Sequence, residues 1–271
     1  MPIAELGGHP FYFERHGRVP AESAGPPLLF LGGTGGDLRR PETRLWGPLA
    51  RQFDLLTFDQ RGMGRSWKGD GPFSMADYAD DAAALMESQG WDRAHVVGVS
   101  FGGMVAQEFA LRHPAKTARL VLCCTAPGGA GGASFAYHGL PEMTPGEMAA
   151  LKVRIADTRH DAAWAKANPA EYRLLLQMAA ADPFHGEPGH AEGAARQLAA
   201  RAGHDCWARL PRLTMPVLVM GGRHDGIAPP RIATALAARI PGARLRIFEG
   251  GHLFMLEDRT AFAAMADFLN A

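Results

Sequence analysis

The stretch His95–Ala110, HVVGVSFGGMVAQEFA, decides the fold that the sequence predicts. It begins with a short valine-rich run, typical of a buried strand, and ends in a helical pattern of apolar residues. Ser100 stands at the turn between them, inside the pattern GVSFG at 98–102. So tight a turn strains the serine backbone, requires small neighbours and pushes the hydroxyl clear of the sheet. The stretch therefore predicts a nucleophilic serine at a strand end, facing the positive N-terminus of a helix.

The rest of the chain alternates short apolar runs with helical patterns. Strands are expected at 26–33, 53–62, 94–100, 118–127, 215–222 and 243–251, and helices at 74–91, 101–114, 229–242 and 259–271. Continuous apolar strands that alternate with helices indicate an α/β fold: a mostly parallel sheet with helices on both faces. The stretch FYFERHG at 11–17 is a candidate for an antiparallel hairpin at the sheet edge.

The segment 128–212 interrupts this alternation because it has helical patches but no good strand. It begins with the flexible stretch GGAGGAS and continues with patches rich in Ala, Met and Trp. A crossover between parallel strands needs only about 10–12 residues, so this segment is much too long for one. We expect a core domain formed by 1–127 and 213–271, with a helical cap subdomain at 128–212 inserted between two of its strands.

The composition of the 271-residue chain excludes several classes of protein. Lys and Arg together number 28, as do Asp and Glu, and no basic stripe suggests a nucleic-acid partner. No apolar run approaches the ~20 residues of a membrane helix, and the N-terminus does not resemble a secretory signal. The three cysteines, two of them adjacent, suit buried thiols in a reducing cytoplasm better than a disulfide framework.

These observations predict a cytoplasmic protein that acts on a small molecule, with no membrane or nucleic-acid partner. No cofactor is implied. The stretch HGEPGH at 185–190 contains proline and glycines and lacks the helical spacing of a metal site, so no metal is expected either. The sequence leaves the oligomeric state open, with a homo-oligomer among the alternatives.

Two further residues complete the chemistry expected of Ser100. A serine hydroxyl is a weak nucleophile that needs a base, and the base needs a carboxylate to orient it. His252 follows the last predicted strand in FEGGHLFMLED, and Asp225 follows the preceding strand in VLVMGGRHDGIAPP. All three residues stand at the C-terminal ends of predicted strands, so we expect Ser100, Asp225 and His252 to form a catalytic triad.

Attack on a carbonyl creates an oxyanion, which needs preorganised hydrogen-bond donors. The backbone N–H of Phe101 is expected to be one donor because Phe101 directly follows the nucleophile. The loop FLGGTGGDLRR at 30–40, after an earlier strand, is expected to supply the other. Thr34 is the preferred donor within it, and Gly33 is the second choice. The loop lacks the G-x-x-x-x-G-K-[ST] pattern of a phosphate-binding loop.

Together these motifs resemble the α/β-hydrolase superfamily over nearly the whole chain, since the triad has the order Ser, Asp, His. The stretch FDQRGMGRS at 58–66 resembles a family turn in which Asp59 and Arg61 are structural. The chain is similar to small bacterial enzymes of the 3-oxoadipate enol-lactonase, aminoacrylate hydrolase and C–C bond (meta-cleavage product) hydrolase types. Like members of the first two types, it lacks the histidine that many relatives carry in the oxyanion loop.

The resemblance implies the α/β-hydrolase fold and a serine hydrolase that cleaves a small carboxylic ester or lactone through an acyl-enzyme. A C–C bond hydrolase acting on a diketone, a cofactor-free perhydrolase, an acyltransferase and a ligand-binding receptor on the same fold remain alternatives. The cap is expected to select the substrate, although it offers no obvious arginine pair for a dicarboxylate. Its candidate substrate-binding residues are His138, Met143, Trp164, Met178 and Phe184.

Overall fold

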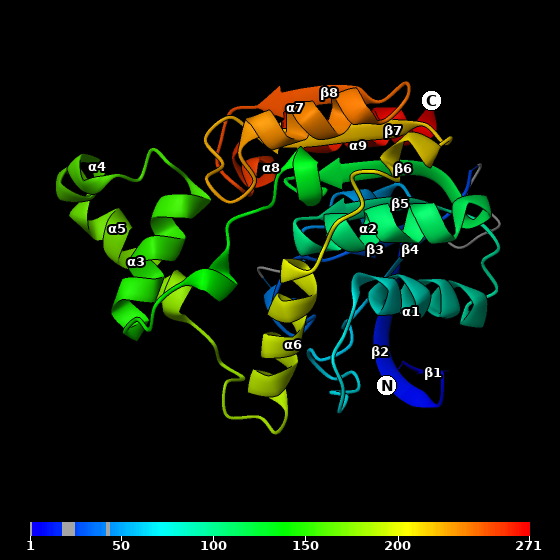
Figure 1. The fold of residues 1–271 in the computed structure, drawn as a ribbon, viewed down its shortest axis with the longest axis horizontal. Coiled ribbons are helices and arrows are strands. Elements are labelled where there is room, and N and C mark those ends of the chain that lie inside the picture. Colours follow the sequence, from blue (N-terminus) through cyan, green and yellow to red (C-terminus); the bar gives the residue numbers. More distant parts are fainter. Residues whose placement is uncertain (1, 18–24, 42–43) are drawn as a thin grey trace.

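The computed structural model of the protein describes residues 2–17, 25–41 and 44–271. Its centre is an eight-stranded sheet with the order β1-β2-β4-β3-β5-β6-β7-β8 (Figure 1). The six strands β3 to β8 are all parallel to one another, whereas β2 pairs antiparallel with both β1 and β4. The strands are β1 (Ile3–Leu6), β2 (His9–His16), β3 (Leu28–Leu31), β4 (Leu55–Phe58), β5 (Ala94–Val99), β6 (Thr117–Cys123), β7 (Val217–Gly222) and β8 (Arg244–Phe248).

Helices cover both faces of this sheet, because successive strand residues point to opposite sides. Leu29 and Leu31 of β3 pack in a cluster with α1 (Met75–Ser88), α2 (Phe101–Arg112) and α7 (Pro230–Arg239). The alternate residues, such as Leu28 and Phe30, pack in a second cluster against the opposite layer. That layer consists of η3 (Leu49–Arg51), α8 (Phe254–Glu257) and α9 (Thr260–Asn270). The mostly parallel sheet between two helical layers confirms the predicted fold class.

The local predictions agree with the structure at several element ends and differ at others. Helix α1 begins at the predicted cap, where Ser74 and Asp77 form a reciprocal capping box. The edge hairpin contains β2 as predicted, but its partner β1 was not predicted. The expected strand at 53–62 is only Leu55–Phe58, because the Asp59 carboxylate accepts backbone N–H bonds from Leu38 and Arg65 and thereby turns the chain out of the sheet.

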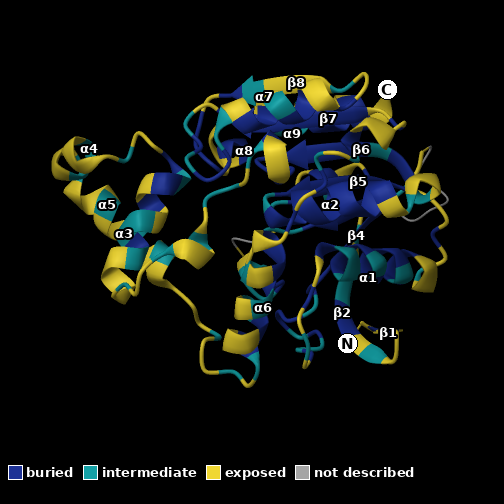
Figure 2. Ribbon diagram, in the orientation of Figure 1, coloured by how far each residue is buried: buried dark blue, intermediate teal, exposed yellow. Residues whose placement is uncertain are grey.

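The chain between β6 and β7 contains only helices and loops in the structure. Three of its helices, α3 (Pro145–Ala156), α4 (Ala162–Ala167) and α5 (Pro169–Ala180), project to one side of the sheet (Figure 1). A fourth, α6 (His190–Ala202), lies against the core and buries part of its surface. By contrast, α4 and α5 contain no buried residue (Figure 2). The short 3-10 turns η5 (Gly129–Gly131), η6 (Tyr137–Gly139) and η7 (Leu210–Arg212) flank these helices, and η4 (Pro114–Lys116) precedes β6.

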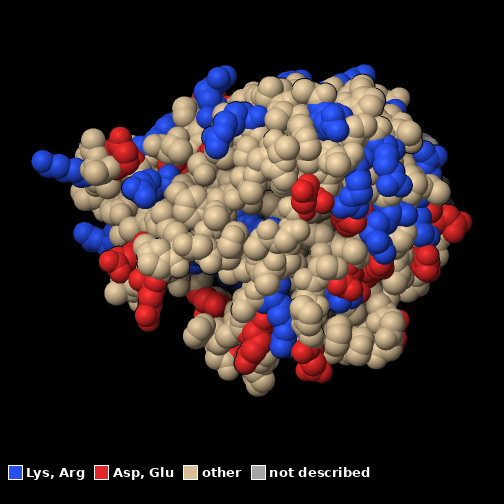
Figure 3. Space-filling model, viewed as in Figure 1, with Lys and Arg blue, Asp and Glu red and all other residues tan. Residues whose placement is uncertain are grey.

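The charged side chains are dispersed over the surface. In Figure 3, acidic and basic side chains lie interspersed on the visible face, as the balanced composition leads one to expect. The same view shows a hollow between the projecting helices and α6. Within the described part of the chain, no helix has the length and apolar character needed to cross a membrane.

Candidate active site

The turn after β5 holds Ser100 in a strained backbone conformation. Its φ is 56° and its ψ is −116°, a region that residues with a side chain rarely adopt. The neighbouring positions must be glycine, because a Cβ at Gly98 would overlap the Gly102 carbonyl oxygen and one at Gly102 would overlap that of Leu31. Hydrogen bonds to Cys123 and from Thr125 hold the Ser100 backbone in place. The packing of the core therefore maintains the strain that exposes the hydroxyl.

The structure brings the three predicted triad residues into one hydrogen-bonded chain. His252 Nε2 lies 2.9 Å from Ser100 Oγ, and His252 Nδ1 lies 2.8 Å from Asp225 Oδ2. The other oxygen, Asp225 Oδ1, accepts the backbone N–H bonds of Ile227 (2.7 Å) and Ala228 (2.8 Å). Asp225 is 2% exposed and His252 is 8% exposed, while Ser100 is half-buried. This arrangement fits a base that accepts the serine proton and a carboxylate that stabilises the resulting imidazolium.

The two predicted oxyanion donors belong to backbone segments next to the serine. Phe101 is the first residue of α2, where a backbone N–H has no intrahelical acceptor. Gly33 lies in direct contact with the nucleophile, since a Cβ built there would be 3.6 Å from the Ser100 Cβ. Thr34 follows it and is exposed. Gly33 thus lies beside Ser100, and the preceding residues Leu31 and Gly32 pack against Gly102 in the first turn of α2.

Two glutamines that the sequence analysis did not single out hold this loop from both sides. Gln60 Nε2 donates to the Gly32 carbonyl over 3.0 Å, and Gln197 Oε1 accepts the Gly35 N–H over 2.6 Å. Both glutamine residues are buried. The sequence could have indicated Gln60, because it lies within the DQRG motif. No sequence pattern indicated Gln197, which belongs to α6. The oxyanion loop is therefore held jointly by the core and by α6.

The end of α3 is tied to the loops that carry the histidine and the aspartate. A Cβ at Gly251 would overlap the Ala156 carbonyl oxygen, so the two backbones approach closely. Three backbone hydrogen bonds make the connection: His252 N–H to the Ala156 carbonyl (2.6 Å), Gly226 N–H to the Ile155 carbonyl (2.9 Å) and Thr158 N–H to the His224 carbonyl (2.9 Å). The placement of the projecting helices is thereby linked to the placement of His252, the candidate base.

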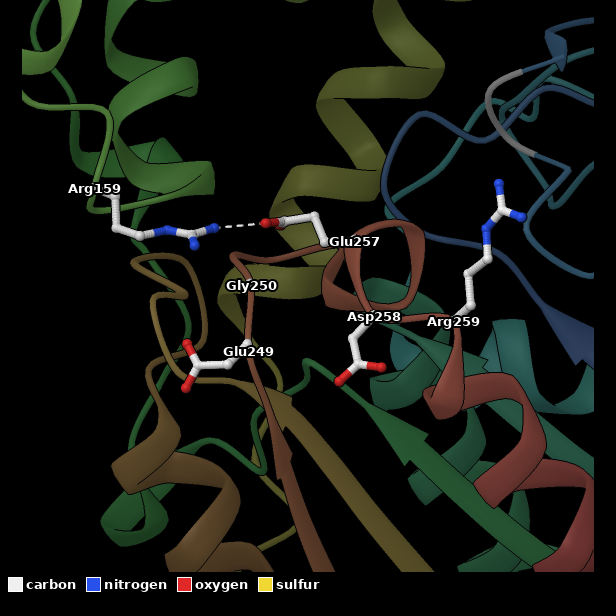
Figure 4. A pocket seen from close by; sticks show the side chains of 6 residues that line it. All are labelled: Arg159, Glu249, Gly250, Glu257, Asp258 and Arg259. Carbon is white, nitrogen blue, oxygen red and sulfur yellow. Dashed lines mark hydrogen bonds and ion pairs between the residues drawn. The ribbon is translucent and has the colours of Figure 1, made fainter.

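Charged side chains reinforce this connection on the outer side of the histidine turn. Glu257 accepts the Gly251 N–H (2.9 Å) and forms an ion pair with Arg159 (2.5 Å), which also pairs with Asp157 (Figure 4). A surface hollow of about 480 Å³ lies here. It is lined by Arg159, Glu249, Gly250, Glu257, Asp258 and Arg259. Because no triad residue lines it, this hollow is the reverse side of the His252 turn and not the reaction site.

The structure scatters the five predicted cap residues over several environments. Trp164 packs among other cap side chains, 4.2 Å from the His160 ring and edge-on to Tyr172. Phe184 lies under the Arg39 guanidinium at 3.6 Å, and so joins the cap to the oxyanion-loop side of the core. Met178 on α5 is 58% exposed. None of these three residues faces a described cavity.

The other two predicted cap residues precede α3 in the chain. Met143 is half-buried just before α3. His138 lines a small cavity of about 30 Å³ beside α2, together with Arg201, which sequence reasoning missed. Arg201 stands in an alanine-rich helical pattern, where an arginine is usually solvent-facing, so the sequence gave no sign of its burial. His138 is thus the predicted cap residue that the structure places in a cavity.

The three cysteines contribute no reactive thiol to the site. All are buried and none forms a disulfide. Burial raises the pKa of each thiol, to about 12 for Cys206, so they stay protonated and unreactive near neutral pH.

Comparisons with known proteins identify the family of the chain. The model of the alpha/beta hydrolase fold family matches residues 26–259, so the chain belongs to this family and is an enzyme. The chain is 31% identical to "Putative carbamate hydrolase RutD" of Pseudomonas savastanoi pv. phaseolicola, over 92% of this chain and 96% of that one. It is 28% identical to the poly(3-hydroxyalkanoate) depolymerase of Ectopseudomonas oleovorans, over 88% and 81%.

Solved structures support the same fold. The enol-lactonase from Burkholderia xenovorans LB400 superimposes with a TM-score of 0.77, covers 100% of both chains and is 24% identical. At this identity the likeness shows the fold alone. The superfamily to which the motifs pointed is confirmed, and the names of these relatives refer to carbamate, poly(3-hydroxyalkanoate) and lactone substrates. The family therefore does not fix the substrate of this chain.

Proposed function

We propose that the protein is a serine hydrolase that cleaves a small carboxylic ester or lactone through an acyl-enzyme on Ser100. The observation that carries this proposal is the continuous hydrogen-bonded chain from Ser100 Oγ through His252 to the buried Asp225. The strained backbone of Ser100 adds support, because such strain clusters at functional sites.

The proposed mechanism uses each group in turn. His252 Nε2 takes the Ser100 proton as Oγ attacks the carbonyl carbon, and the N–H groups of Phe101 and Thr34 stabilise the oxyanion. His252 then gives this proton to the leaving alcohol oxygen, and the carbon–oxygen bond of the ester breaks. A water molecule, deprotonated by His252, attacks the acyl-enzyme and releases the acid with Ser100 restored. Asp225 keeps the imidazole in one tautomer throughout.

We also propose that residues 128–212 act as a cap that selects the substrate. Two observations support this role: α6 holds the oxyanion loop through Gln197, and the end of α3 holds the turn of His252. Groups on both sides of the reacting carbonyl are therefore in contact with this segment. A substrate that fits between α6 and the projecting helices meets the triad and the cap together.

The test is steady-state hydrolysis of p-nitrophenyl esters from acetate to octanoate by wild type and by Ser100→Ala. We expect wild type to turn over the shorter esters and Ser100→Ala to lower kcat by at least ~10⁴-fold, because triad members act as a unit. The variant should be as stable as wild type, or more stable if the strain relaxes.

An alanine variant with near wild-type turnover would overturn the assignment of Ser100. Absence of turnover in a wild-type protein that still reacts covalently with a fluorophosphonate would instead favour a C–C bond hydrolase or a receptor. Product analysis with added alcohol or peroxide would reveal an acyltransferase or a perhydrolase.

A further inference from the structure

The oxyanion loop contains a β-turn whose central peptide is held from outside the loop. The Gly36 N–H donates to the Gly33 carbonyl over 3.2 Å, and Gly35 has a φ of 71°, whereas Thr34 does not have a positive φ. A positive φ at the third residue alone defines a type II turn. Type I and type II turns differ mainly in the orientation of the peptide between the second and third residues, here Thr34 and Gly35. The Gly35 N–H belongs to this peptide, so its hydrogen-bond partner helps to decide the form of the turn.

The partner of the Gly35 N–H is Gln197 of α6. Its Oε1 accepts this N–H over 2.6 Å, and the residue is fully buried. The Nε2 atom of the same amide is also buried and forms no hydrogen bond within the described part of the chain. An unpaired buried donor costs free energy, and a leucine or methionine would fill the same space without that cost. The amide of Gln197 is therefore explained by its oxygen, which serves the turn.

The peptide between Gly33 and Thr34 carries the N–H proposed as the second oxyanion donor. Its carbonyl oxygen, on Gly33, accepts the hydrogen bond that closes the turn, and in a trans peptide the N–H points the opposite way. The peptide before it is held by Gln60, which donates to the Gly32 carbonyl, and the peptide after it is held by Gln197. The direction of the Thr34 N–H is therefore set by bonds to the peptide itself and to both of its neighbours.

Helix α6 is held closely against the core one turn before Gln197. A Cβ at Gly193 would lie 1.9 Å from the Gly62 carbonyl oxygen, so the two backbones are in direct contact. Gly193 and Gln197 are four residues apart and therefore lie on the same face of the helix. The contact between Gly193 and Gly62 thus sets the distance over which the Gln197 side chain reaches the turn.

We infer that Gln197 is a positioning residue for the reaction at Ser100. By holding the Gly35 N–H it keeps the Thr34 N–H directed at the oxyanion, and it thereby couples the placement of α6 to the rate of acyl transfer. Gln197 acts through the backbone and does not touch the substrate. This inference rests on the proposed function, since it concerns the transition state at the same serine. It assigns Gln197 an effect on kcat and not on substrate binding, because the oxyanion forms only during the reaction.

The first test is Gln197→Met, because methionine has a similar length but no acceptor oxygen. We expect kcat for p-nitrophenyl esters to fall by about 10- to 100-fold, less than the ~10²–10³-fold that loss of a whole oxyanion donor costs. KM should stay within about twofold of wild type, since the oxyanion is absent from the bound substrate. The value of kcat is expressed per Ser100 that reacts with a fluorophosphonate. A role in stability alone would lower the Tm and the number of reactive serines, so an unchanged kcat per reactive serine would overturn the inference.

Gln177→Met is the matched control, because it makes the same substitution in the same inserted segment. Gln177 lies on α5 and is exposed. The variant should keep the wild-type kcat. If it lowers kcat as much as Gln197→Met does, the loss reflects the segment as a whole and the assigned role of Gln197 is wrong.

A double-mutant cycle tests whether the effect passes through α6. Gly193→Ala leaves Gln197 in place but adds a Cβ that must push α6 away from the Gly62 carbonyl oxygen. We expect Gly193→Ala to lower kcat by at least ~3-fold in wild type and by less than about twofold in Gln197→Met, since both changes act on one contact. If the two effects multiply in full, the coupling between α6 and the turn is wrong.

The rate of fluorophosphonate labelling separates this inference from the proposed ester hydrolysis. Ser100 Oγ attacks phosphorus, His252 takes the proton and fluoride leaves, while the phosphoryl oxygen gains negative charge that the same N–H groups stabilise. Gln197→Met should therefore lower the second-order rate constant of labelling by about the same factor as kcat. If labelling slows in this variant although wild type hydrolyses no ester, the positioning role stands and the proposed function fails. If wild type and Gln197→Met hydrolyse esters and are labelled at equal rates, the function stands and the positioning role fails.

Discussion

The sheet edge that carries the triad and the projecting helices α3–α5 are built in opposite ways. Every residue of β5 and β7 is buried, whereas α4 and α5 bury none, and Leu174 on α5 is 56% exposed. The position of Ser100 follows from backbone contacts within the core, which leave little freedom. The projecting helices have few such constraints, and regions with few buried contacts open at lower free energy. The proposed catalytic groups are therefore fixed by packing, and the proposed selection of the substrate falls to a less constrained part of the chain.

The two regions meet at the His252 turn, and this contact limits how independent they are. The Ala156 carbonyl at the end of α3 accepts the His252 N–H, and Arg159 and Glu257 form an ion pair beside it. A displacement of α3 would disturb the backbone of the catalytic base. The comparison thus predicts large effects from changes at the sheet edge, and small effects from equivalent changes in the projecting helices away from this contact.

We expect the largest difference in kcat between two variants in which an aspartate is replaced by asparagine. In Asp225→Asn the amide oxygen can keep the bonds from Ile227 and Ala228, but the amide nitrogen would face His252 and impose the wrong tautomer. We expect kcat to fall by about 10⁴-fold with the fold intact. Asp161→Asn at the start of α4 should leave kcat unchanged, because asparagine caps a helix as well as aspartate does. Equal kcat values for the two variants would contradict the assigned role of Asp225.

A second contrast compares two glycines replaced by alanine, with urea denaturation as the measurement. A Cβ at Gly98 would overlap the Gly102 carbonyl oxygen, so Gly98→Ala should lower the free energy of unfolding by about 3 kcal/mol or more. A Cβ at Gly146 on α3 meets nothing within 4 Å, and alanine favours a helix. Gly146→Ala should therefore raise stability, by up to about 1 kcal/mol. If both variants change the free energy of unfolding in the same direction, the difference in packing between the core turn and α3 is wrong.

The smallest effect concerns the pH dependence of stability. Burial lowers the pKa values of His95 and His204 to about 4, below the ~6.5 of an unfolded chain. As the pH falls from about 6.5 to about 4, the unfolded state binds protons that the native state does not. The free energy of unfolding should therefore fall in this window. Denaturation curves at pH 7.5 and 5 should show that the free energy of unfolding falls less between these two pH values in His204→Gln than in wild type. His185→Gln, in an exposed part of the cap segment, should lose as much as wild type does.

The sequence predicted the sheet and the grouping of the triad residues because both depend on local patterns. Apolar strands that end in glycine-rich turns define a parallel sheet, and the loops after such strands converge at one edge. Ser100, Asp225 and His252 therefore lie together in the structure as expected. The same argument located the Gly33–Thr34 loop but not Gln197, which reaches it from 162 residues further along the chain.

The side-chain environments of the segment 128–212 escaped prediction because they depend on long-range packing. Periodicity located its helices but did not show that α6 would lie on the core while α3–α5 project from it. Arg201 is buried in contact with Ser134, Phe135 and Tyr137, whereas the helical pattern alone favours exposure. Conversely, Met178 looked like a pocket residue and is exposed.

The most direct test of the central claim is covalent labelling of Ser100 by a fluorophosphonate, followed by intact-protein mass spectrometry. The account predicts one phosphonyl adduct per chain in wild type, located at Ser100. It predicts no adduct in Ser100→Ala and much slower labelling in His252→Ala, because the hydroxyl then lacks its base. A wild-type protein that stays unlabelled, or an alanine variant labelled as fast as wild type, would contradict the claim that the strained turn presents an activated nucleophile.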